Sequence, residues 1–508
     1  MSGRTFAEDL CERAKLHPAR TALITPEAPV SYGELDRWAS RLARSLVELG
    51  VKRGDRVATL LPNGTAAAIA IYGVLRSGAA FSPINPTTKR ERLSELLADL
   101  EAAAVICAPE HREMVLAAAE NAGEIPVLSV LDDGLDTELD ARDFALSLEV
   151  DLAAVIYTSG STGEPKGVVL THRNMTFVAD SIIEYLELSQ ADRILCLLPL
   201  SFNYGLYQLL MSIRVGATLV LEPGFAFSGR TVSLLVDEEI TALPGVPTVF
   251  QTLLSLRGLR ERSFPNLRLI TNAGAPLPAG AVVAIRETFP NTNLFLMYGQ
   301  TEATRIAYLR PELVDAKPTA VGGAIPGTEV WIEDDDGNML GAGETGELMV
   351  RGAHVMQGYW NDPDGTAARL RPGRWPWERV VRTNDLFRLD EDGQLHFVSR
   401  RDDVIKSRGE KVAPHEVEKI LRSDPGVSEA AVVGIPDHLL GEAVVAHVAP
   451  TSGTDVDPVA LRRLCAEKLE DYKVPRRIDV HPQLPKNING KVDRAALIAQ
   501  PDTEPPSS

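Results

Sequence analysis

Residues 153–167 read AAVIYTSGSTGEPKG and combine a strand pattern with an anion-binding pattern. The apolar run at 153–157 is bounded by turn-forming residues, which predicts a buried strand. The loop that follows carries four hydroxyl side chains and ends at Lys166. Glycines let backbone N–H groups converge on an anion, while hydroxyls add donors and the ammonium adds charge. The stretch predicts a strand that leads into a phosphate-binding loop, against the plainer interpretation of a flexible Ser/Gly turn.

Two common nucleotide motifs do not fit this loop. A Walker A loop needs GxxxxGK followed by Ser or Thr and a helix, whereas Lys166 is followed by Gly167 and the strand-like Val168–Leu170. The GxGxxG spacing of a dinucleotide-binding loop is also absent here.

The first 150 residues alternate between helical and strand patterns. Apolar residues with helical spacing run from Leu35 to Leu46, and Gly50 suits the left-handed residue that ends a helix. Strand patterns at 56–61 and 103–107 flank a helical pattern that begins near Thr65. This alternation is typical of a layered α/β domain with a mainly parallel sheet.

Beyond Gly322 short strand patterns dominate, and after Ser399 the sequence reads as a compact α+β segment. The fold class expected is therefore α/β, with the following parts in chain order: a large N-terminal domain of layered α/β subdomains over 1–399, with a small β-rich, barrel-like part from about 322; a small, mobile α+β C-terminal lid domain over 400–499; and a disordered tail over 500–508.

Composition limits the partners. The 508 residues include 52 Lys and Arg against 70 Asp and Glu, so the net charge is −18 and broad binding to nucleic acid is not expected. The 44% hydrophobic content excludes a mainly disordered chain. Four scattered cysteines do not form a disulfide framework or a CxxC metal site. The apolar run 66–75 is too short to span a bilayer, so we expect a cytoplasmic protein without integral membrane association.

Six motifs in order resemble those of the adenylate-forming superfamily, which includes acyl-CoA synthetases, peptide-synthetase adenylation domains and luciferases. They cover nearly the whole chain and lie at 157–167, at 298–302 (YGQTE), at 346–348 with 358–360 (GEL and GYW), at 382–385 (RTND), at 400–409, and at 485–491. The resemblance implies an ATP-dependent, AMP-forming acid–thiol ligase of the acyl-CoA synthetase group. Its partners would be a small carboxylic acid, ATP with Mg²⁺, and coenzyme A.

The resemblance also implies a role for individual residues in ATP binding. The loop would hold the β- and γ-phosphates through Thr158, Ser159, Gly160, Ser161, Thr162, Gly163 and Lys166. The adenine site would include Asn272, Ala273, Gly274, Tyr298, Gly299 and Gln300. Thr301 would contact the α-phosphate, and Glu302 would be the Mg²⁺ ligand. On spacing alone, Tyr298 reads as an ordinary core aromatic.

Three further positions match family residues of the ribose site and of catalysis. Asp385 would accept the ribose hydroxyls with help from Arg400, although a lone charge is more often in a surface salt bridge. Lys491 would bridge the substrate carboxylate and the α-phosphate, together with Thr301 and Glu302 as catalytic residues. Its plainer interpretation is a solvated lysine in a turn.

The same motifs predict a change of pose between two reactions. Asp402 falls at the hinge position, and Gly409 falls where the second pose lines a tunnel for pantetheine. Asn384 replaces the glycine of the RTND motif; since Asn tolerates positive φ next best to glycine, we expect the ribose contact to persist. Asn487 stands where Thr or Ser is usual.

The predicted acyl pocket contains Phe202, Asn203, Tyr204, Val246, Gly299 and Ala303. Amino-acid-activating relatives place Asp at the position of Asn203 to pair with the substrate ammonium. A buried ammonium beside a neutral amide is unfavourable, so we expect a hydrophobic acid (fatty, aryl or a bulky natural product) and not an α-amino acid.

Two other functions stay open at this point. A stand-alone acyl-AMP ligase would load an acyl carrier protein instead of coenzyme A. A non-catalytic acyl or nucleotide binder would have no need to retain Lys166, Glu302, Asp385 and Lys491 together.

Overall fold

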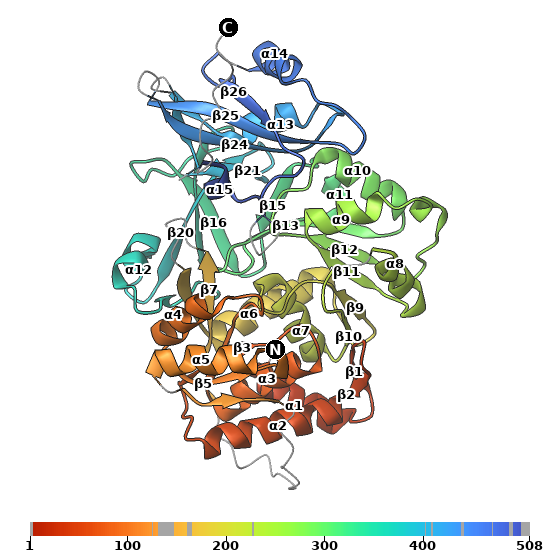
Figure 1. The fold of residues 1–508 in the computed structure, drawn as a ribbon, viewed down its shortest axis with the longest axis vertical. Coiled ribbons are helices and arrows are strands. Elements are labelled where there is room, and N and C mark those ends of the chain that lie inside the picture. The colour runs from red at the N-terminus through yellow and green to blue at the C-terminus, as the bar shows by residue number, and fades with distance from the viewer. Residues whose placement is uncertain are drawn as a thin grey trace. The chain divides into compact units, whose positions relative to one another are not determined.

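A computed structural model describes residues 4–123, 125–130, 147–159, 165–225, 228–401, 403–407, 410–437, 441–469, 471–486 and 491–498. The chain divides into two compact units (Figure 1). Unit 1 comprises Met1–Val330 and Met349–Arg382, and unit 2 comprises Trp331–Leu348 and Thr383–Ser508. The predicted domain boundary at 399/400 stays a prediction, and the predicted disordered tail lies outside the described residues.

The first sheet of unit 1 has the order β18-β8-β7-β4-β3-β5-β6 in the described part of the chain. Its strands are β3 (Arg56–Leu60), β4 (Ala80–Pro83), β5 (Ala102–Cys107), β6 (Val127–Leu128), β7 (Leu152–Ser159), β8 (Pro165–Thr171) and β18 (Gly358–Tyr359). Pairs from β7 through β6 are parallel, whereas β8 is antiparallel to both β7 and β18. The strands predicted at 56–61, 103–107 and 153–157 are confirmed.

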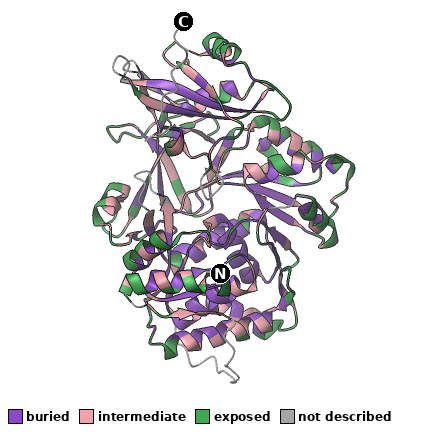
Figure 2. Cartoon of the chain, in the orientation of Figure 1, coloured by how far each residue is buried: buried purple, intermediate pink, exposed green. Residues whose placement is uncertain are grey.

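The second sheet contributes the run β15-β14-β13-β12-β11-β9-β10-β1-β2 to unit 1. Its strands are β1 (Thr21–Ile24), β2 (Pro29–Ser31), β9 (Arg193–Cys196), β10 (Thr218–Leu221), β11 (Ala242–Gly245), β12 (Leu269–Asn272), β13 (Asn293–Tyr298), β14 (Ala307–Leu309) and β15 (Ala320–Ala324). The central strands β10, β9, β11, β12 and β13 are parallel, as expected for a layered α/β domain. Figure 2 shows these strands mostly buried.

Helices connect the strands of unit 1. They are α1 (Phe6–Leu16), α2 (Tyr32–Glu48), α3 (Thr65–Ser77), α4 (Arg90–Leu100), α5 (Arg112–Gly123), α6 (His172–Leu186), α7 (Asn203–Val215), α8 (Ser228–Asp237), α9 (Pro247–Leu254), α10 (Ala279–Thr288), α11 (Pro311–Val314) and α12 (Pro363–Arg369). Helices α8, α9 and α10 pack their apolar side chains with those of β9 and β11–β13 in one core. A second core joins α4 and α5 to β3 and β5.

Helix α2 shows how local sequence produces one of these elements. Ser31 and Glu34 form a capping box that satisfies the first backbone N–H groups. Leu35 and Leu46, three turns apart on one face, are fully buried. Gly50, just beyond the helix, has φ of 91°, so the predicted left-handed end is confirmed.

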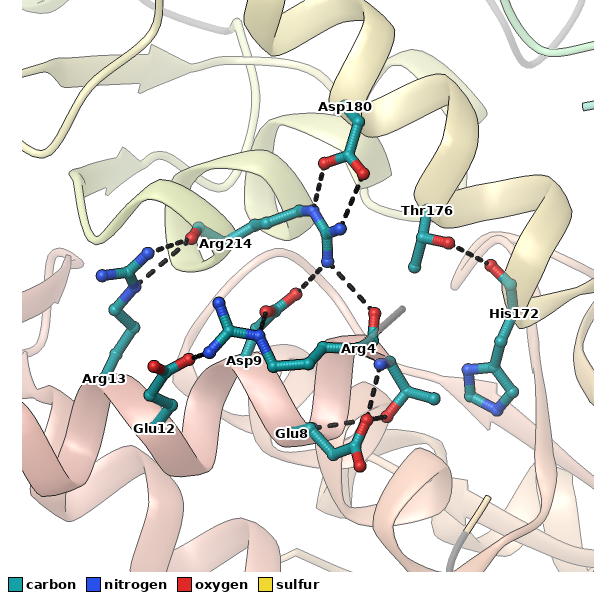
Figure 3. Close-up of polar contacts among 10 residues, drawn as sticks. Arg4, Glu8, Asp9, Glu12, Arg13, His172, Thr176, Asp180 and Arg214 are labelled. Atoms are coloured by element: carbon teal, nitrogen blue, oxygen red, sulfur yellow. Dashed lines mark hydrogen bonds and ion pairs between the residues drawn. The ribbon is translucent and has the colours of Figure 1, made fainter. Parts of the chain in front are cut away.

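A buried guanidinium ties three helices of unit 1 together (Figure 3). Arg214 on α7 contacts Asp180 on α6 through two bonds of 2.5 and 2.8 Å and also pairs with Asp9 on α1. Burial raises the pKa of Asp9 to about 6 against the lowering effect of Arg214. With two carboxylates around it, this guanidinium is fully compensated.

Some strands carry the chain between the units: β16 (Thr328–Glu333), β17 (Thr345–Gly352) and β20 (Arg379–Leu389), with β19 (Leu370–Pro372) paired to the start of β20. The β-rich stretch predicted after Gly322 is thus confirmed. Its predicted barrel-like form is wrong, because its strands join an open sheet, and every described sheet is open.

Unit 2 contains a five-stranded sheet of order β23-β22-β25-β24, with β26 beside β25. From Leu395 onward, unit 2 contains the strands and helices β21 (Leu395–Arg400), β22 (Ile405–Ser407), β23 (Glu410–Val412), α13 (Pro414–Leu421), β24 (Val427–Asp437), β25 (Gly441–Pro450), α14 (Pro458–Lys468), β26 (Arg477–Val480) and α15 (Arg494–Ile498). Apolar side chains of α13 and α14 cover one face of this sheet. The predicted α+β character is confirmed. No helix of the described residues is long and apolar enough to cross a membrane.

Candidate active site

The phosphate loop connects two paired strands. β7 and β8 form an antiparallel pair in which Thr158 faces Lys166 and Ser159 faces Pro165. The intervening Gly160, Ser161, Thr162 and Gly163 lie outside the described residues. The structure therefore fixes both ends of the predicted loop, and it confirms that a strand, not a helix, follows Lys166.

Lys166 faces the segment that carries the GYW motif. Its Nζ lies 2.9 Å from Asp362 Oδ2 and 5.0 Å from the centre of the Tyr359 ring. Asp362 also accepts the N–H of Gly365 and so caps α12. The hydrogen bond from Lys166 lowers the pKa of Asp362, so this carboxylate is ionised beside the ammonium.

Glu302 also contacts Tyr359, at its hydroxyl. The Tyr359 hydroxyl donates to Glu302 Oε1 at 2.6 Å, and Arg369 Nη2 contacts the same oxygen at 3.2 Å. Glu302 is buried, and its backbone carbonyl accepts the N–H of Met356. Burial and the Glu302 charge raise the pKa of Tyr359, so its phenol stays protonated and donates. The structure thus brings the predicted phosphate lysine to the ring of Tyr359 and the predicted metal ligand to its hydroxyl.

Sequence reasoning did not assign roles to Tyr359, Asp362 or Arg369. Tyr359 stands in a quoted motif, which was the available signal. Asp362 and Arg369 carry no local signal, because their importance depends on contacts with residues far away in the sequence.

The predicted adenine residues of unit 1 lie at the carboxyl ends of neighbouring parallel strands. β11, β12 and β13 end at Gly245, Asn272 and Tyr298, and Gly245 pairs with Asn272. Ligands of open α/β sheets bind beyond such ends. Asn272 donates to Ala275 O at 3.0 Å, and its buried Oδ1 accepts no bond from the described residues, which fits an acceptor for a ligand N–H group.

The predicted adenine residues therefore come together, since Ala273 and Gly274 follow β12 directly and Gly299 follows β13. Gln300 donates to the Tyr298 hydroxyl at 3.2 Å. Thr301 and Ala303 occupy the turn that carries Glu302. After this turn the chain continues into β14, which pairs with β13 in the antiparallel direction.

Two predicted pocket residues, Val246 and Phe202, adjoin the predicted adenine residue Gly274. Gly274 has φ of +86°, and a Cβ there would lie 3.4 Å from Val246 Cγ1 and 3.8 Å from the Phe202 ring. Gly299 is glycine for a packing reason, because a Cβ would stand 2.1 Å from Thr304 O. The small size of Gly299 therefore says nothing by itself about the size of the acyl group.

The start of α7 forms another wall of this region. Asn203 donates to Thr304 Oγ1 at 3.4 Å, and its buried Oδ1 has no partner among the described residues. Tyr204 reaches β12, where its hydroxyl donates to Thr271 O at 2.9 Å. The guanidinium of Arg305 lies 5.2 Å from the centre of the Tyr204 ring. Arg305 was missed from the sequence, although it closely follows the YGQTE motif.

The ribose residues lie in unit 2. Asp385 and Arg400 are directly opposed on β20 and β21, with Arg400 Nε 3.6 Å from Asp385 Oδ1. Asp385 is buried, and its backbone N–H donates to Thr383 Oγ1. An arginine placed beside the carboxylate matches the predicted pair.

Lys491 lies within electrostatic range of these two residues. Crowding by protein atoms and the charge of Arg400 lower the pKa of its ammonium, against the charge of Asp385, while the side chain as a whole keeps solvent exposure. Residues 91 positions apart in the chain, Arg400 and Lys491, therefore act on one another. Asp402, Gly409 and Asn487 lie outside the described residues.

Asn384 has φ of +59°, so the expected left-handed conformation is confirmed. Its backbone N–H donates to Glu347 Oε1 at 3.1 Å, and Arg401 holds Glu347 Oε2 at 2.9 Å. The backbone N–H of Arg401 donates a hydrogen bond to the backbone carbonyl oxygen of Asn384. Asn therefore replaces the family glycine without loss of the turn that presents Asp385.

Two family models match the chain: "AMP-binding enzyme" over residues 10–360 and "AMP-binding enzyme C-terminal domain" over 416–491. A feruloyl-CoA synthase of Amycolatopsis sp is 35% identical over 483 residues, which are 94% of this chain and 96% of the relative. An indoleacetate–CoA ligase of Aromatoleum aromaticum is 32% identical and covers 96% of each chain. The o-succinylbenzoate-CoA synthetase (MenE) of Bacillus subtilis, solved with its acyl-adenylate intermediate, superposes with a TM-score of 0.86 at 29% identity, covering 99% of this chain and 100% of that one.

Fold and site together define an adenylate-forming α/β enzyme. The chain belongs to the AMP-binding enzyme family, in the group of AMP-forming acid–thiol ligases.

Proposed function

We propose that this enzyme is an ATP-dependent acyl-CoA synthetase that works through an acyl-adenylate. A carboxylate oxygen of the acid attacks the α-phosphorus of ATP, the bond to the β-phosphate oxygen breaks, and pyrophosphate leaves. The thiol of coenzyme A then loses its proton and attacks the acyl carbon, the C–O bond to AMP breaks, and AMP leaves. The second step is favourable because AMP is a much better leaving group than an oxide ion.

The observation that carries this proposal is the arrangement of Lys166, Tyr359 and Glu302. Lys166 would stabilise the charge of the leaving pyrophosphate, because it presents an ammonium at the end of a hydroxyl-rich loop. Tyr359 holds the Glu302 carboxylate in one orientation through the 2.6 Å bond. Asp362, which engages Lys166 in this structure, would exchange that ammonium with the phosphates when ATP binds.

Glu302 fits a Mg²⁺ ligand of the kind found with nucleotides. The described residues contain no group of three or more His, Cys, Asp or Glu side chains that could hold a metal by themselves. Mg²⁺ commonly takes one or two carboxylates and completes its coordination with phosphate oxygens and water. Glu302 would hold the ion, which would supply charge neutralisation for adenylation.

Asp385, Arg400 and Lys491 supply the other half of the chemistry. The Asp385 carboxylate suits the two ribose hydroxyls, and the Arg400 guanidinium lies beside it. Lys491, already influenced by both charges, would bridge the carboxylate of the acid and the α-phosphate. Thr301, in the turn that bears Glu302, would donate its hydroxyl to the α-phosphate.

We further propose that the two half-reactions use two poses, with rotation of residues 400–499 about a hinge at Asp402. In the first pose Lys491 serves adenylation, and in the second Gly409 lines the path of the pantetheine thiol. The proposal rests on the motif positions of these residues, since one active site must admit first a lysine and then a thiol.

Coenzyme A as acceptor is supported by the names of the relatives, among them a feruloyl-CoA synthase and an indoleacetate–CoA ligase. ATP as the nucleotide is supported by the Asn272, Asp385 and Lys166 positions. We propose a largely apolar acid, because the side chains of Phe202, at the start of α7, and Val246 both approach Gly274. Asn203 gives no anionic partner for an α-ammonium, which argues against an α-amino acid.

The test is pyrophosphate release from ATP across a panel of acids, with and without coenzyme A. Release that depends on the acid, together with an acyl-CoA product, is expected. Acyl-AMP without thioester on coenzyme A, but with transfer to a carrier protein, would favour the acyl-AMP ligase alternative. No release with any fatty, aryl or dicarboxylic acid would overturn the enzymatic proposal.

A further inference from the structure

Arg305 is a buried cation without an anionic partner in the described part of unit 1. Its side chain is 5% exposed, and its Nε has no hydrogen-bond partner among the described residues. The guanidinium lies over the Tyr204 ring, and its charge acts on the Tyr185 hydroxyl. The Tyr185 hydroxyl in turn donates to Met297 Sδ.

The phenols around this guanidinium do not neutralise it. Burial raises the pKa of Tyr204 to about 12, against the lowering effect of Arg305. Burial also raises the pKa of Tyr185 and of Tyr207. All three rings are therefore neutral at physiological pH.

A comparison with Arg214 shows that this is unusual within the same unit. Arg214 is similarly buried but contacts the carboxylates of Asp180 and Asp9. An uncompensated buried charge is costly, so proteins retain one where a counterion or ligand completes it. Arg305 therefore requires an anion that the described protein residues do not supply.

Arg305 borders the predicted acyl pocket. It directly follows Thr304, whose hydroxyl accepts a bond from Asn203 at 3.4 Å. The Tyr204 ring, over which the Arg305 guanidinium lies, belongs to the residue that follows Asn203 in α7. Its hydroxyl donates to Thr271 O near the end of β12. Asn203 Oδ1 is a second buried polar atom with no partner among the described residues. Two orphan polar groups beside one pocket are expected where a ligand provides the missing partners.

We propose that Arg305 is a specificity-determining residue that binds a second acidic group, a carboxylate, on the acid substrate. A guanidinium pairs with a carboxylate through two parallel hydrogen bonds, which orients as well as neutralises the group. The substrate then combines an apolar body with two carboxylates, one of which is adenylated. This inference rests on the proposed function and narrows its substrate class.

The experiment compares α,ω-dicarboxylic acids from malonic to dodecanedioic acid, and the three benzenedicarboxylic acids, with the monomethyl ester of each. The readout is kcat/KM for pyrophosphate release by the full chain. For the best diacid we expect the wild-type enzyme to prefer the diacid over its ester by about 10- to 100-fold, the value of a charged hydrogen-bonded pair. In Arg305→Met the preference should fall below about 3-fold or reverse.

Two variants separate recognition from a merely structural role. Arg305→Lys retains the charge and should keep a reduced preference for the diacid. Arg214→Met removes a compensated buried guanidinium, so it should lower thermal stability yet leave the diacid-to-ester ratio unchanged. If Arg305→Met does not fold, the wild-type ratio and the Lys variant decide the question.

The outcomes distinguish this inference from the function on which it rests. Equal or better activity with the esters in the wild type, or an equal loss for diacid and ester in Arg305→Met, would overturn the role of Arg305 alone. Absence of pyrophosphate release with every acid would instead overturn the acyl-CoA synthetase proposal.

Discussion

The Tyr359 hydroxyl donates a 2.6 Å hydrogen bond to Glu302 Oε1, across 57 residues of sequence. The same ring lies 5.0 Å from the Lys166 ammonium. One tyrosine thus couples the orientation of the proposed metal ligand to that of the proposed phosphate lysine. The first three predictions concern this centre and the catalytic roles proposed for Lys491 and Gly409.

Replacing Tyr359 with Phe should lower kcat/KM for pyrophosphate release by about 10- to 100-fold, because a hydrogen bond to a charged group contributes about 1.5–3 kcal/mol. The ring remains, so folding should be little affected. Tyr72→Phe is the matched control, since the buried Tyr72 hydroxyl has no hydrogen-bond partner among the described residues. Equal activity of the Tyr359 and Tyr72 variants would refute a positioning role for Tyr359.

Lys166→Ala should raise KM for ATP and lower the rate of pyrophosphate release at least 10-fold, since an ammonium near the phosphates contributes strong electrostatic stabilisation. Steady-state kinetics at varied ATP concentration measures both effects. Lys52→Ala, at an exposed lysine of the same unit, should behave as wild type. An unchanged KM for ATP together with an unchanged rate would remove Lys166 from the site.

Lys491→Ala should impair acyl-AMP formation far more than thioester formation from supplied acyl-AMP. Gly409→Leu should do the reverse, because a side chain there would obstruct the thiol path. Each half-reaction is measured separately by quenched-flow analysis of acyl-AMP and acyl-CoA. A parallel loss of both half-reactions in each variant would contradict the assignment of two poses.

Asn384 tests the turn that presents Asp385. Asn384→Gly should retain KM for ATP within about 2-fold, because glycine adopts φ of +59° freely. Asn384→Val should raise this KM and lower the thermal midpoint, since a β-branched residue is strained at positive φ. Similar behaviour of the Gly and Val variants would show that the left-handed conformation is not needed.

The lowered pKa of Glu418 leads us to expect that the free energy of unfolding of unit 2 depends on pH. Burial alone would raise its pKa, but hydrogen bonding with His415 and the charges of Arg494 and Arg422 lower it to about 2 from 4.5. The folded-state pKa is depressed, so this stabilisation is complete above about pH 4.5 and is lost as pH falls toward 2. Its size is on the order of 3 kcal/mol.

Glu418→Gln should therefore be less stable than wild type at pH 6, and the difference in thermal midpoint should shrink as pH falls from 5 to 3. Glu416→Gln on the same helix is the control, because Glu416 is half-exposed and pairs with Lys473 at the surface. Surface pairs contribute about 0–1 kcal/mol, so the control should change little at any pH. A pH-independent deficit in Glu418→Gln would contradict the depressed pKa.

Local sequence patterns predicted much of the fold. The apolar spacing of α2 and the left-handed Gly50 just beyond its end depend only on residues close together in the sequence. The strand–loop–strand around Lys166 and the positive φ of Asn384 likewise follow from local chemistry. These features are readable because the interactions that determine them join residues close in sequence.

The remainder depends on contacts that no local pattern encodes. Tyr359 and Arg369 contact Glu302, and Asp362 contacts Lys166. These contacts join residues that are far apart in the sequence and accompany the pairing of β18 with β8. In the sequence, Arg305 looks like an ordinary charged residue. The structure shows that it is buried beside Tyr204, with no carboxylate of the described residues paired with it. The six-motif resemblance supplied the positions of Asp385 and Lys491, and unit 2 brings their charges within range of one another.

The central claim is that the acid is activated as an acyl-adenylate before thiol attack. It is tested most directly by reacting an acid labelled with ¹⁸O in both carboxylate oxygens with ATP and coenzyme A, and by analysing the AMP by mass spectrometry. The acid used is the one that gives the fastest pyrophosphate release. We predict AMP that carries one ¹⁸O atom, because a carboxylate oxygen bonds to the α-phosphorus and stays there when the thiol displaces AMP. Unlabelled AMP, or the appearance of ADP with labelled inorganic phosphate, would contradict the account.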